Sequence, residues 1–216
     1  AEFVAIYGRR RVGKTFLVDE TFGDRITFRH AGLSPAEWRS KEEALSAQLN
    51  HFYQSLKLQG LQGASCPADW LEAFYLLETL LLSMPGSDRQ VVFLDELPWM
   101  DTENSHFITA LEGFWNTWAC HRKNLMLIVC GSASSWMLDH LINNHGGLYG
   151  RLTCSIPLAP FTLRESEEFL QAKGVKLSRN DVVQAYMAVG GIPYYLDAFE
   201  EGMSLAQNLD QMFFAD

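Results

Sequence analysis

Residues Gly8–Thr15 read G-R-R-R-V-G-K-T and match the phosphate-binding pattern G-x-x-x-x-G-K-[ST] at every fixed position. The apolar run Phe3–Tyr7 before the loop suits a buried strand, and the residues from Phe16 to Glu20 can open a helix. Unpaired backbone N–H groups and the helix dipole at such a helix start both favour an anion. The sequence therefore predicts a phosphate site here, with a chance glycine turn as the alternative interpretation.

Individual positions of this loop have predicted tasks if the anion is a nucleotide. Lys14 would reach the β- and γ-phosphates, and the hydroxyl of Thr15 would hold Mg²⁺. The triple arginine is the one dense basic run in the chain, and a nucleotide explains it better than nucleic acid does. The predicted nucleotide-binding residues of the loop are Gly8, Arg9, Arg10, Arg11, Val12, Gly13, Lys14, Thr15 and Phe16.

Two carboxylates follow a second apolar run. Val91–Leu94 is followed directly by Asp95 and Glu96, and the carboxyl ends of strands are where open α/β sheets bind ligands. Asp95 is predicted to take Mg²⁺, usually through water, because this hard cation prefers oxygen ligands. Glu96 would polarise the attacking water as a general base. A solvated turn after a strand is the alternative for both.

Two further polar side chains are candidates for contact with a nucleotide. Ser132 follows the apolar run Leu125–Cys130 and would sense the γ-phosphate or the water, or else would cap a helix over Ser134–Leu141. Arg151, after Gly150, would stabilise charge on the γ-phosphate of its own or a neighbouring chain's nucleotide. The alternative for Arg151 is a surface arginine after a glycine turn.

A glycine-rich corner, Gly190-Gly191-Ile192-Pro193, lies between two helical patterns. Two glycines let backbone approach a ligand closely, and Pro193 fixes a helix start. Such a corner can cover the adenine or the sugar, with Pro193 as the predicted contact. A plain helix–helix turn is the alternative.

Strand-like runs alternate with helical patterns as far as residue 159, which predicts an α/β fold with a parallel sheet covered on both faces. The predicted strands are Phe3–Tyr7, Ile26–Arg29, Val91–Leu94, Leu125–Cys130 and Thr153–Ile156. The predicted helices between them are Ser40–Leu56, Phe107–Trp118 and one whose apolar face carries Trp70, Phe74, Leu77 and Leu81, broadened by Leu71, Tyr75 and Leu82.

After Pro160 only helical patterns remain. They span Leu163–Lys173, Arg179–Val189, Pro193–Glu201 and Leu205–Phe213, with Ser178 as an N-cap and Gly190 as a stop. We therefore expect two parts, a core over residues 1–159 and a small all-helical lid over residues 160–216.

The composition excludes several classes of function. A net charge of −9 over 216 residues argues against a broad nucleic-acid-binding surface on this chain. Nothing resembles a signal peptide or a membrane span, so we expect no membrane partner and a cytoplasmic location. The chain begins at Ala1, without an initiating Met and directly at the first predicted strand, which suggests a piece of a longer protein. The cysteines, Cys66, Cys120, Cys130 and Cys154, show no C-x-x-C spacing, so reduced thiols are expected rather than zinc.

Taken together, these motifs resemble the archaeal-type ATPases of the STAND group of AAA+-related P-loop NTPases. The resemblance rests on the loop Tyr7–Thr15, Leu94–Glu96, Gly131–Ser132, Tyr149–Arg151 and Gly190–Pro193, and it covers nearly the whole chain. It implies a three-layer sandwich with sheet order 5-1-4-3-2, a helical lid, and ATP or ADP with Mg²⁺. That order would place the first strand between those of Cys130 and Cys154, out of disulfide reach.

The resemblance implies hydrolysis used as a conformational switch, and we expect slow Mg²⁺-dependent ATP turnover. The alternative is a regulatory module that holds nucleotide with negligible turnover; Glu96 favours hydrolysis, since a pure binder needs no general base. A small-molecule kinase ranks last because lid arginines are sparse, namely Arg164 and Arg179. Expected partners are the nucleotide, another copy of the chain and an unidentified protein, with nucleic acid binding only through a C-terminal domain outside this sequence.

Overall fold

The computed structural model describes residues 1–34, 40–84, 88–143 and 146–214. The chain divides into two compact units, the first made of Ala1–Tyr7 and Thr15–Pro157, the second of Gly8–Lys14 and Leu158–Asp216. The second unit thus begins close to the expected start of the lid at residue 160. One difference from the expected division is that the phosphate loop Gly8–Lys14 groups with the helices of the second unit.

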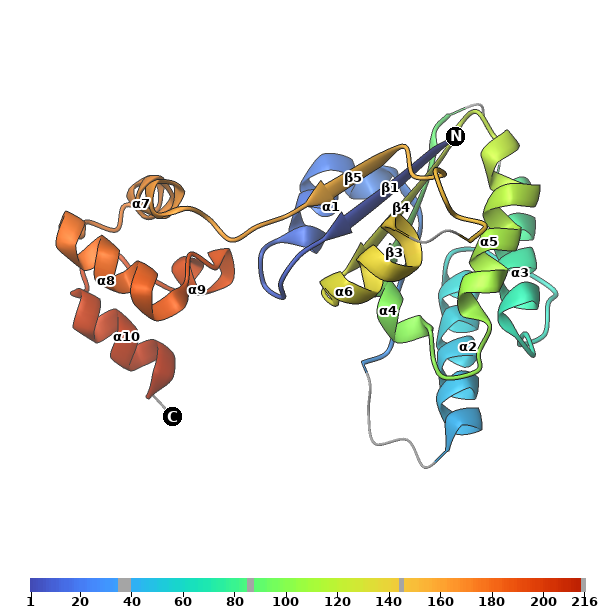
Figure 1. Ribbon diagram of the computed structural model, residues 1–216, viewed down its shortest axis with the longest axis horizontal. Coiled ribbons are helices and arrows are strands. Elements are labelled where there is room, and N and C mark those ends of the chain that lie inside the picture. The colour runs from blue at the N-terminus through green and yellow to red at the C-terminus, as the bar shows by residue number, and fades with distance from the viewer. Residues whose placement is uncertain (35–39, 85–87, 144–145, 215–216) are drawn as a thin grey trace. The chain divides into compact units, whose positions relative to one another are not determined.

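The first unit is built on a five-stranded sheet in the order β2-β3-β4-β1-β5, with every neighbouring pair parallel (Figure 1). Its strands are β1 (Glu2–Tyr7), β2 (Ile26–Ala31), β3 (Gln90–Asp95), β4 (Leu125–Gly131) and β5 (Cys154–Pro157). All five predicted strands are present, and the predicted order 5-1-4-3-2 is the same order read from the other edge. The α/β fold class is confirmed.

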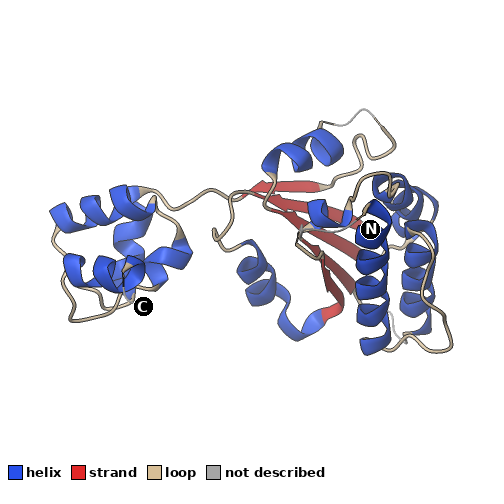
Figure 2. Ribbon diagram, turned by 90° about the horizontal axis from the view of Figure 1, so that it is seen from below, coloured by secondary structure: helices blue, strands red, loops and turns tan. Residues whose placement is uncertain are grey.

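Helices flank this sheet on both sides (Figure 2). They are α1 (Lys14–Phe22), α2 (Lys41–Leu58), α3 (Trp70–Ser83), α4 (Leu97–Met100), α5 (Phe107–Thr117) and α6 (Ser134–Met137), with 3₁₀ turns at Gly23–Arg25 and Ala119–His121 and a π-helical turn at Leu138–Ile142. One continuous core joins Phe28 of β2 to Phe52, Trp70, Phe74 and Phe107 on α2, α3 and α5. Buried aromatic rings of this size supply much of the hydrophobic stabilisation of the unit.

The apolar face of α3 is narrower than the sequence predicts. Trp70, Phe74, Leu77 and Leu81 are fully buried, as expected. Leu71, Tyr75 and Leu82 are instead 60%, 67% and 56% exposed, so the prediction that they broaden the buried face is wrong. Each of the three follows a buried residue by one position, and a step of one residue turns the side chain about 100° around the helix. The packing of α3 against α2 and α5 buries only the first stripe.

The second unit contains α7 (Leu163–Ala172), α8 (Arg179–Val189), α9 (Pro193–Asp197) and α10 (Leu205–Phe213). Capping boxes begin three of them, at Thr162, Ser178 and Ser204, each satisfying backbone N–H groups at the helix start. The predicted N-cap Ser178, stop Gly190 and helix start Pro193 are confirmed, although α9 ends at Asp197 rather than Glu201. Its core includes Leu170, Val189, Leu196 and Phe199.

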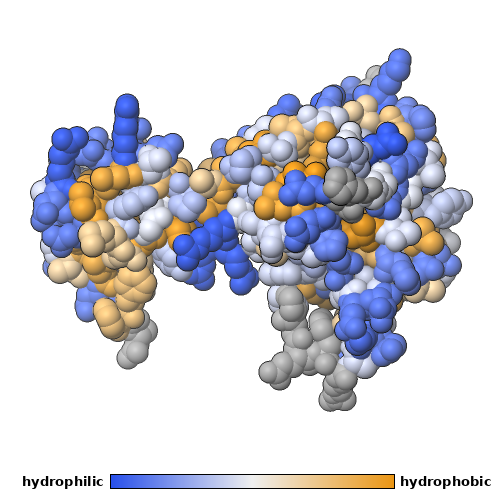
Figure 3. Space-filling view, in the orientation of Figure 1, coloured by the Kyte–Doolittle hydropathy of each residue, from blue (hydrophilic) through white to orange (hydrophobic). Residues whose placement is uncertain are grey.

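Several large hydrophobic side chains remain on the surface of the second unit (Figure 3). They include Val183, Met187, Phe213 and Phe214. None of the helices in the described ranges has the length and apolar character needed to cross a bilayer.

The cysteines follow the predicted strand order. Cys130 pairs in register with Ile6, and Cys154 pairs with Val4 on the other side of the same strand, so β1 separates the two thiols. None of the four cysteines, all of which lie in the described ranges, forms a disulfide, as expected.

A buried histidine in β2 is unusual for a residue that can carry charge. His30 is 2% exposed, and its Nδ1 lies 2.9 Å from Ser55 Oγ. Its Nε2 is buried, and no residue in the described ranges forms a hydrogen bond with it. Burial, together with the nearby His51, lowers the pKa of His30 from 6.5 to about 3. The imidazole is therefore neutral in the folded chain at ordinary pH.

This depressed pKa makes stability fall in mild acid. Between the folded pKa of about 3 and the unfolded value of 6.5, only the unfolded chain binds the proton, so stability is lost as the pH falls below 6.5. Lowering the pH from 7.5 to 5 should remove about 2 kcal/mol through His30 alone. Urea unfolding should show that His30→Leu loses less stability over this range than wild type; equal losses in the two proteins would show that folding does not lower the pKa of His30.

Candidate functional site

Polar residues meet at the carboxyl edge of the sheet in the first unit. β1 ends at Tyr7, which pairs with Gly131 at the end of β4, and Ser132 follows directly. β3 runs parallel beside β4 and ends at Asp95, followed by Glu96. This is the edge at which parallel α/β sheets bind ligands. The two motifs that the sequence placed after β3 and β4 are therefore neighbours.

Thr15 and Asp95, the two predicted magnesium residues, are in direct contact. Thr15 Oγ1 donates a hydrogen bond of 2.6 Å to Asp95 Oδ2. The other carboxylate oxygen, Oδ1, accepts from the backbone N–H of Glu96 at 2.9 Å, which fixes the orientation of the group. A hydroxyl and a carboxylate are oxygen donors that suit Mg²⁺, which keeps most of its remaining ligands as water or phosphate. The residues present therefore fit the cation.

Glu96 adopts a backbone conformation that few residues other than glycine tolerate. Its φ of 45° and ψ of 49° lie in the left-handed region, directly before α4. Such strain persists only where the surroundings impose it. Here Ser132 donates two hydrogen bonds to Glu96 Oε2, from its backbone N at 3.1 Å and from Oγ at 2.8 Å. The carboxylate is thus held in place at the edge of the sheet.

Ser132 was predicted either to sense the γ-phosphate or the water, or to cap a helix, and its contacts argue against the capping role. The N-cap position of α6 is Ala133, and no side chain caps that helix, so the capping alternative for Ser132 is not what the structure shows. The hydroxyl of Ser132 instead orients Glu96. Contact of Ser132 with a γ-phosphate stays a prediction.

The loop Gly8–Lys14 in the second unit is folded around its own lysine. Lys14 is only 6% exposed, and its Nζ donates to the carbonyl oxygens of Gly8 and Arg9, both at 3.0 Å. Gly8 permits a close backbone approach: a Cβ there would lie 2.0 Å from the carbonyl oxygen of Leu158. The ammonium thus points back into the loop, where the phosphates of a nucleotide are predicted to lie.

The other predicted loop positions flank this lysine. Val12 is buried and anchors the loop, whereas Arg9, Arg10, Arg11 and Phe16 are exposed. Gly13 has a φ of 93°, which favours glycine. Their contact with nucleotide stays a prediction.

The Gly190–Pro193 corner makes a tight turn between α8 and α9. Gly190 is the left-handed C-cap of α8, and Pro193 is the first residue of α9. The carbonyl of Gly191 accepts from the backbone N–H of Phe161 at 2.8 Å, and a Cβ at Gly191 would lie 2.1 Å from the carbonyl oxygen of Phe161. The corner is therefore a close backbone contact, and cover of a base by Pro193 stays a prediction.

The structure does not bring Arg151 to Thr15 and Asp95. Arg151 lies in an exposed turn that precedes β5, and Thr153 just after it bonds to Phe3 near the start of β1. Arg151 thus lies near the amino ends of the strands, whereas the site residues follow their carboxyl ends. Along β1 these two ends are separated by five residue steps of about 3.3 Å each. Action on the nucleotide of a neighbouring chain remains a prediction for Arg151.

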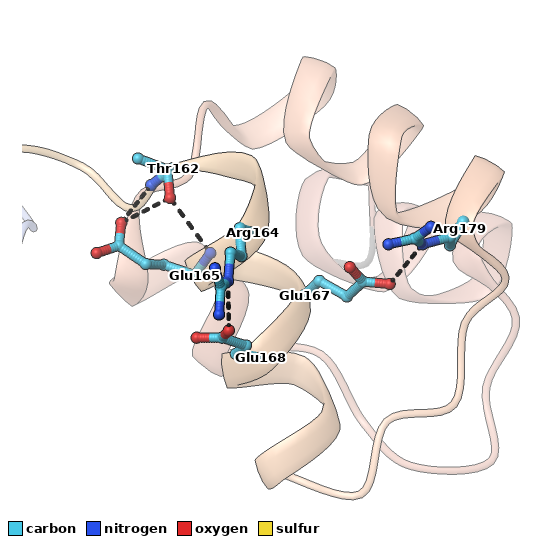
Figure 4. Close-up of polar contacts among 6 residues, drawn as sticks. All are labelled: Thr162, Arg164, Glu165, Glu167, Glu168 and Arg179. Atoms are coloured by element: carbon cyan, nitrogen blue, oxygen red, sulfur yellow. Dashed lines mark hydrogen bonds and ion pairs between the residues drawn. The ribbon is translucent and has the colours of Figure 1, made fainter.

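The two lid arginines are engaged by lid carboxylates (Figure 4). Arg164 Nε lies 2.8 Å from Glu168 Oε1, one turn along α7, and Arg179 Nε lies 3.3 Å from Glu167 Oε1. Such exposed pairs contribute little stability. They nevertheless direct both guanidinium groups to partners within the helical unit.

Sequence reasoning missed one set of contacts in this unit. Tyr194 and Tyr195, the two residues after Pro193, both pack against Arg11. The signal was present in two places, an arginine run inside a phosphate loop and an aromatic pair behind a glycine corner, but nothing in the spacing relates them.

Known proteins match this chain over most of its length. A family described as "ATPase domain predominantly from Archaea" matches residues 1–199. An uncharacterized protein of Methanocaldococcus jannaschii is 27% identical over 200 residues, which is 91% of this chain and 39% of that protein. The match thus extends over both units, although the chain spans well under two thirds of that relative.

Two solved structures are similar in fold. The Walker-type ATPase of Pyrococcus abyssi has a TM-score of 0.57 and 18% identity, over 99% of this chain and 63% of that one. A signal transduction ATPase with numerous domains and a tetratricopeptide repeat sensor, from Pyrococcus horikoshii, has a TM-score of 0.52 and 16% identity, over 99% of this chain and 30% of that one. At these identities the likeness concerns the fold alone.

Substitutions at Gly190 and Gly191 test the close backbone contact between Gly191 and Phe161. Gly190 and Gly191 have φ values of 68° and 67°, but only Gly191 has backbone within reach of a Cβ. Gly190→Ala should destabilise the chain by about 1 kcal/mol from left-handed strain. Gly191→Ala should lose about 1–3 kcal/mol more, because the Phe161 carbonyl must move. Chemical unfolding of both variants measures the difference, and equal losses would show that the close contact is absent.

Proposed function

This chain belongs to the family of ATPase domains found predominantly in Archaea, and on that premise we propose that it binds ATP with Mg²⁺ at Gly8–Thr15 and hydrolyses it slowly as a conformational switch. The observation that carries the proposal is the contact between Thr15 and Asp95. The two residues are 80 positions apart and come from separate motifs, yet their oxygens lie 2.6 Å from each other. Both are oxygen ligands suited to a magnesium–nucleotide complex.

Binding is assigned to the phosphate loop and the start of α1. Backbone N–H groups at a helix N-terminus donate to phosphate oxygens, and the helix dipole adds favourable potential. The ammonium of Lys14 now donates to two loop carbonyls and would turn to the β- and γ-phosphate oxygens. Thr15 directly and Asp95 through water would hold Mg²⁺, which would supply positive charge to those phosphates.

Hydrolysis is assigned to Glu96. A water oxygen attacks the γ-phosphorus, the bond from that phosphorus to the β–γ bridging oxygen breaks, and the proton of the water passes to the Glu96 carboxylate. Ser132 engages Oε2, so Oε1 is the oxygen assigned to accept the proton. Ser132 thereby acts on the reaction through the orientation of the base.

Nucleotide storage with negligible turnover is the second candidate function. The same two hydrogen bonds favour it, because they commit Oε2 of the Glu96 carboxylate to Ser132 rather than to water. Hydrolysis of bound ATP in a single turnover separates the two functions.

The biological output is a proposal that extends beyond this chain. We propose a STAND-type switch located in the cytoplasm, in which the helical unit responds to nucleotide and segments outside residues 1–216 provide the output. Self-association, an unidentified protein partner, and nucleic acid bound through those outside segments are the proposed partners. Arg151 is the proposed residue of a self-association site.

Replacement of Lys14 tests nucleotide binding. Lys14→Ala removes the cation that faces the β- and γ-phosphates, and charge-assisted hydrogen bonds are among the stronger polar contacts. Calorimetry with Mg–ATP should show affinity reduced by about 2–3 kcal/mol, or roughly 30- to 150-fold. Lys176→Ala, an exposed lysine of the helical unit, is the charge-matched control and should bind as wild type. Equal affinity of wild type and Lys14→Ala would refute the site.

Replacement of Glu96 tests the hydrolytic step. Glu96→Gln keeps the shape and a hydrogen-bond acceptor but takes up no proton, so it should bind ATP normally and lower the single-turnover rate by roughly 100-fold or more. Glu20→Gln, on an exposed turn of α1, should keep the wild-type rate. If wild type hydrolyses ATP and Glu96→Gln does so at the same rate, Glu96 is not the base; if wild type shows no turnover at all, nucleotide storage is the function.

A further inference from the structure

Arg11 occupies a left-handed backbone conformation inside the phosphate loop. Its φ is 67°, a value that glycine adopts freely and that disfavours a residue with a side chain. Glycine stands at Gly8 and Gly13 of the same loop, but not here. An arginine held in this conformation needs surroundings that impose it, and such outliers cluster where the strain has a function.

The surroundings that hold Arg11 come from the start of α9. The carbonyl oxygen of Arg11 accepts from the backbone N–H of Tyr194 at 3.4 Å. The guanidinium carbon lies 4.7 Å from the centre of the Tyr194 ring and 5.2 Å from that of Tyr195, distances typical of cation–π contacts. Nη1 also donates a hydrogen bond to the hydroxyl of Tyr195. Backbone and side chain of Arg11 are thus both held by the tyrosine pair.

The tyrosine pair is itself fixed by the core of the helical unit. Pro193 begins α9, the backbone N–H of Tyr195 donates to the carbonyl of Ile192 at 3.0 Å, and Leu196 is fully buried. Arg11, Tyr194, Tyr195, Asp197, Ala198 and Met212 line a hollow of about 480 Å³. The guanidinium therefore lies among residues of the helices.

The positive charge of Arg11 is not neutralised by these contacts. Asp197, the carboxylate beside the hollow, pairs with Lys173 at 2.9 Å. Arg11 itself has no ion pair within the described part of the chain. Tyrosine rings hold a guanidinium without neutralising it, so its positive potential still favours an anion in the loop.

We propose that Arg11 is a positioning residue, clamped by Tyr194 and Tyr195, that holds the loop Gly8–Lys14 in the shape that receives phosphate. The helical unit thereby sets the nucleotide affinity of the loop through α9. This inference rests on the proposed function for its ligand, but the clamp itself exists without nucleotide. The competing account is that Arg11 contacts phosphate directly and that its packing on the tyrosines is incidental.

The first arm of the test uses the chain without nucleotide. Hydrogen exchange should show the loop amides from Val12 to Thr15 exchanging about tenfold faster in Arg11→Met and in Tyr195→Leu than in wild type, because the loop opens locally once the clamp is lost. Arg9→Met removes the same charge from the loop, and Tyr75→Leu removes an exposed tyrosine of α3; both should leave this exchange at the wild-type rate. Unchanged exchange in Arg11→Met and Tyr195→Leu, with both proteins folded by circular dichroism, would overturn the clamp.

The second arm measures Mg–ATP affinity in a double-mutant cycle. Arg11→Met and Tyr195→Leu should each weaken binding about tenfold, and the double variant should lie within about twofold of either single one, because both remove the same clamp. If the fold-losses of affinity in the two single variants multiply in the double variant, Arg11 contacts phosphate independently of Tyr195, and the positioning role is overturned. Arg9→Met combined with Tyr195→Leu is the control and should show multiplied effects. If wild type binds no nucleotide, the proposed function fails, and the exchange arm alone decides on the clamp.

Discussion

The parallel pairing of β1 with β4 and of β4 with β3 is the constraint on which the site depends. Parallel strands all end at one edge, so the residues that follow them meet there although they are far apart in sequence. The pairing of β3 with β4 is enough to make Asp95, Glu96 and Ser132 neighbours. The start of α1 then places Thr15 in contact with the Asp95 carboxylate. An antiparallel partner at any of these positions would place its polar end at the opposite edge and dismantle the site.

Each unit contains one non-glycine residue with a left-handed backbone conformation close to the proposed nucleotide site. Glu96 and Arg11 both have positive φ, and each is held by specific donors or rings rather than by glycine's freedom. In the first unit Ser132 imposes the position of a proposed base. In the second unit Tyr194 and Tyr195 impose the position of a loop arginine. Both arrangements fix groups before ligand arrives, which reduces the ordering that binding must accomplish.

The sequence predicted the strands, because buried parallel strands are unbroken apolar runs, and it predicted magnesium roles for Thr15 and Asp95 from the loop motif and from the carboxylate after a strand. The sheet order was implied by the family resemblance, not by these patterns. Sequence reasoning misjudged Leu71, Tyr75 and Leu82, since hydrophobicity alone does not tell which side of a helix its neighbours cover. The contacts of Arg11 with Tyr194 and Tyr195 could not be predicted from the sequence. They depend on a three-dimensional approach of residues 183 or more positions apart, with no period or pattern in common.

The central claim is that Thr15 and Asp95 belong to a magnesium–nucleotide site, and a crystal structure of the chain with Mg²⁺ and a non-hydrolysable ATP analogue tests it most directly. The account predicts phosphate oxygens accepting from the backbone N–H groups that end the loop, a cation about 2.0–2.1 Å from Thr15 Oγ1, and Asp95 reaching that cation directly or through one water. A nucleotide bound away from Gly8–Thr15, or a cation that Thr15 does not ligate, would contradict it.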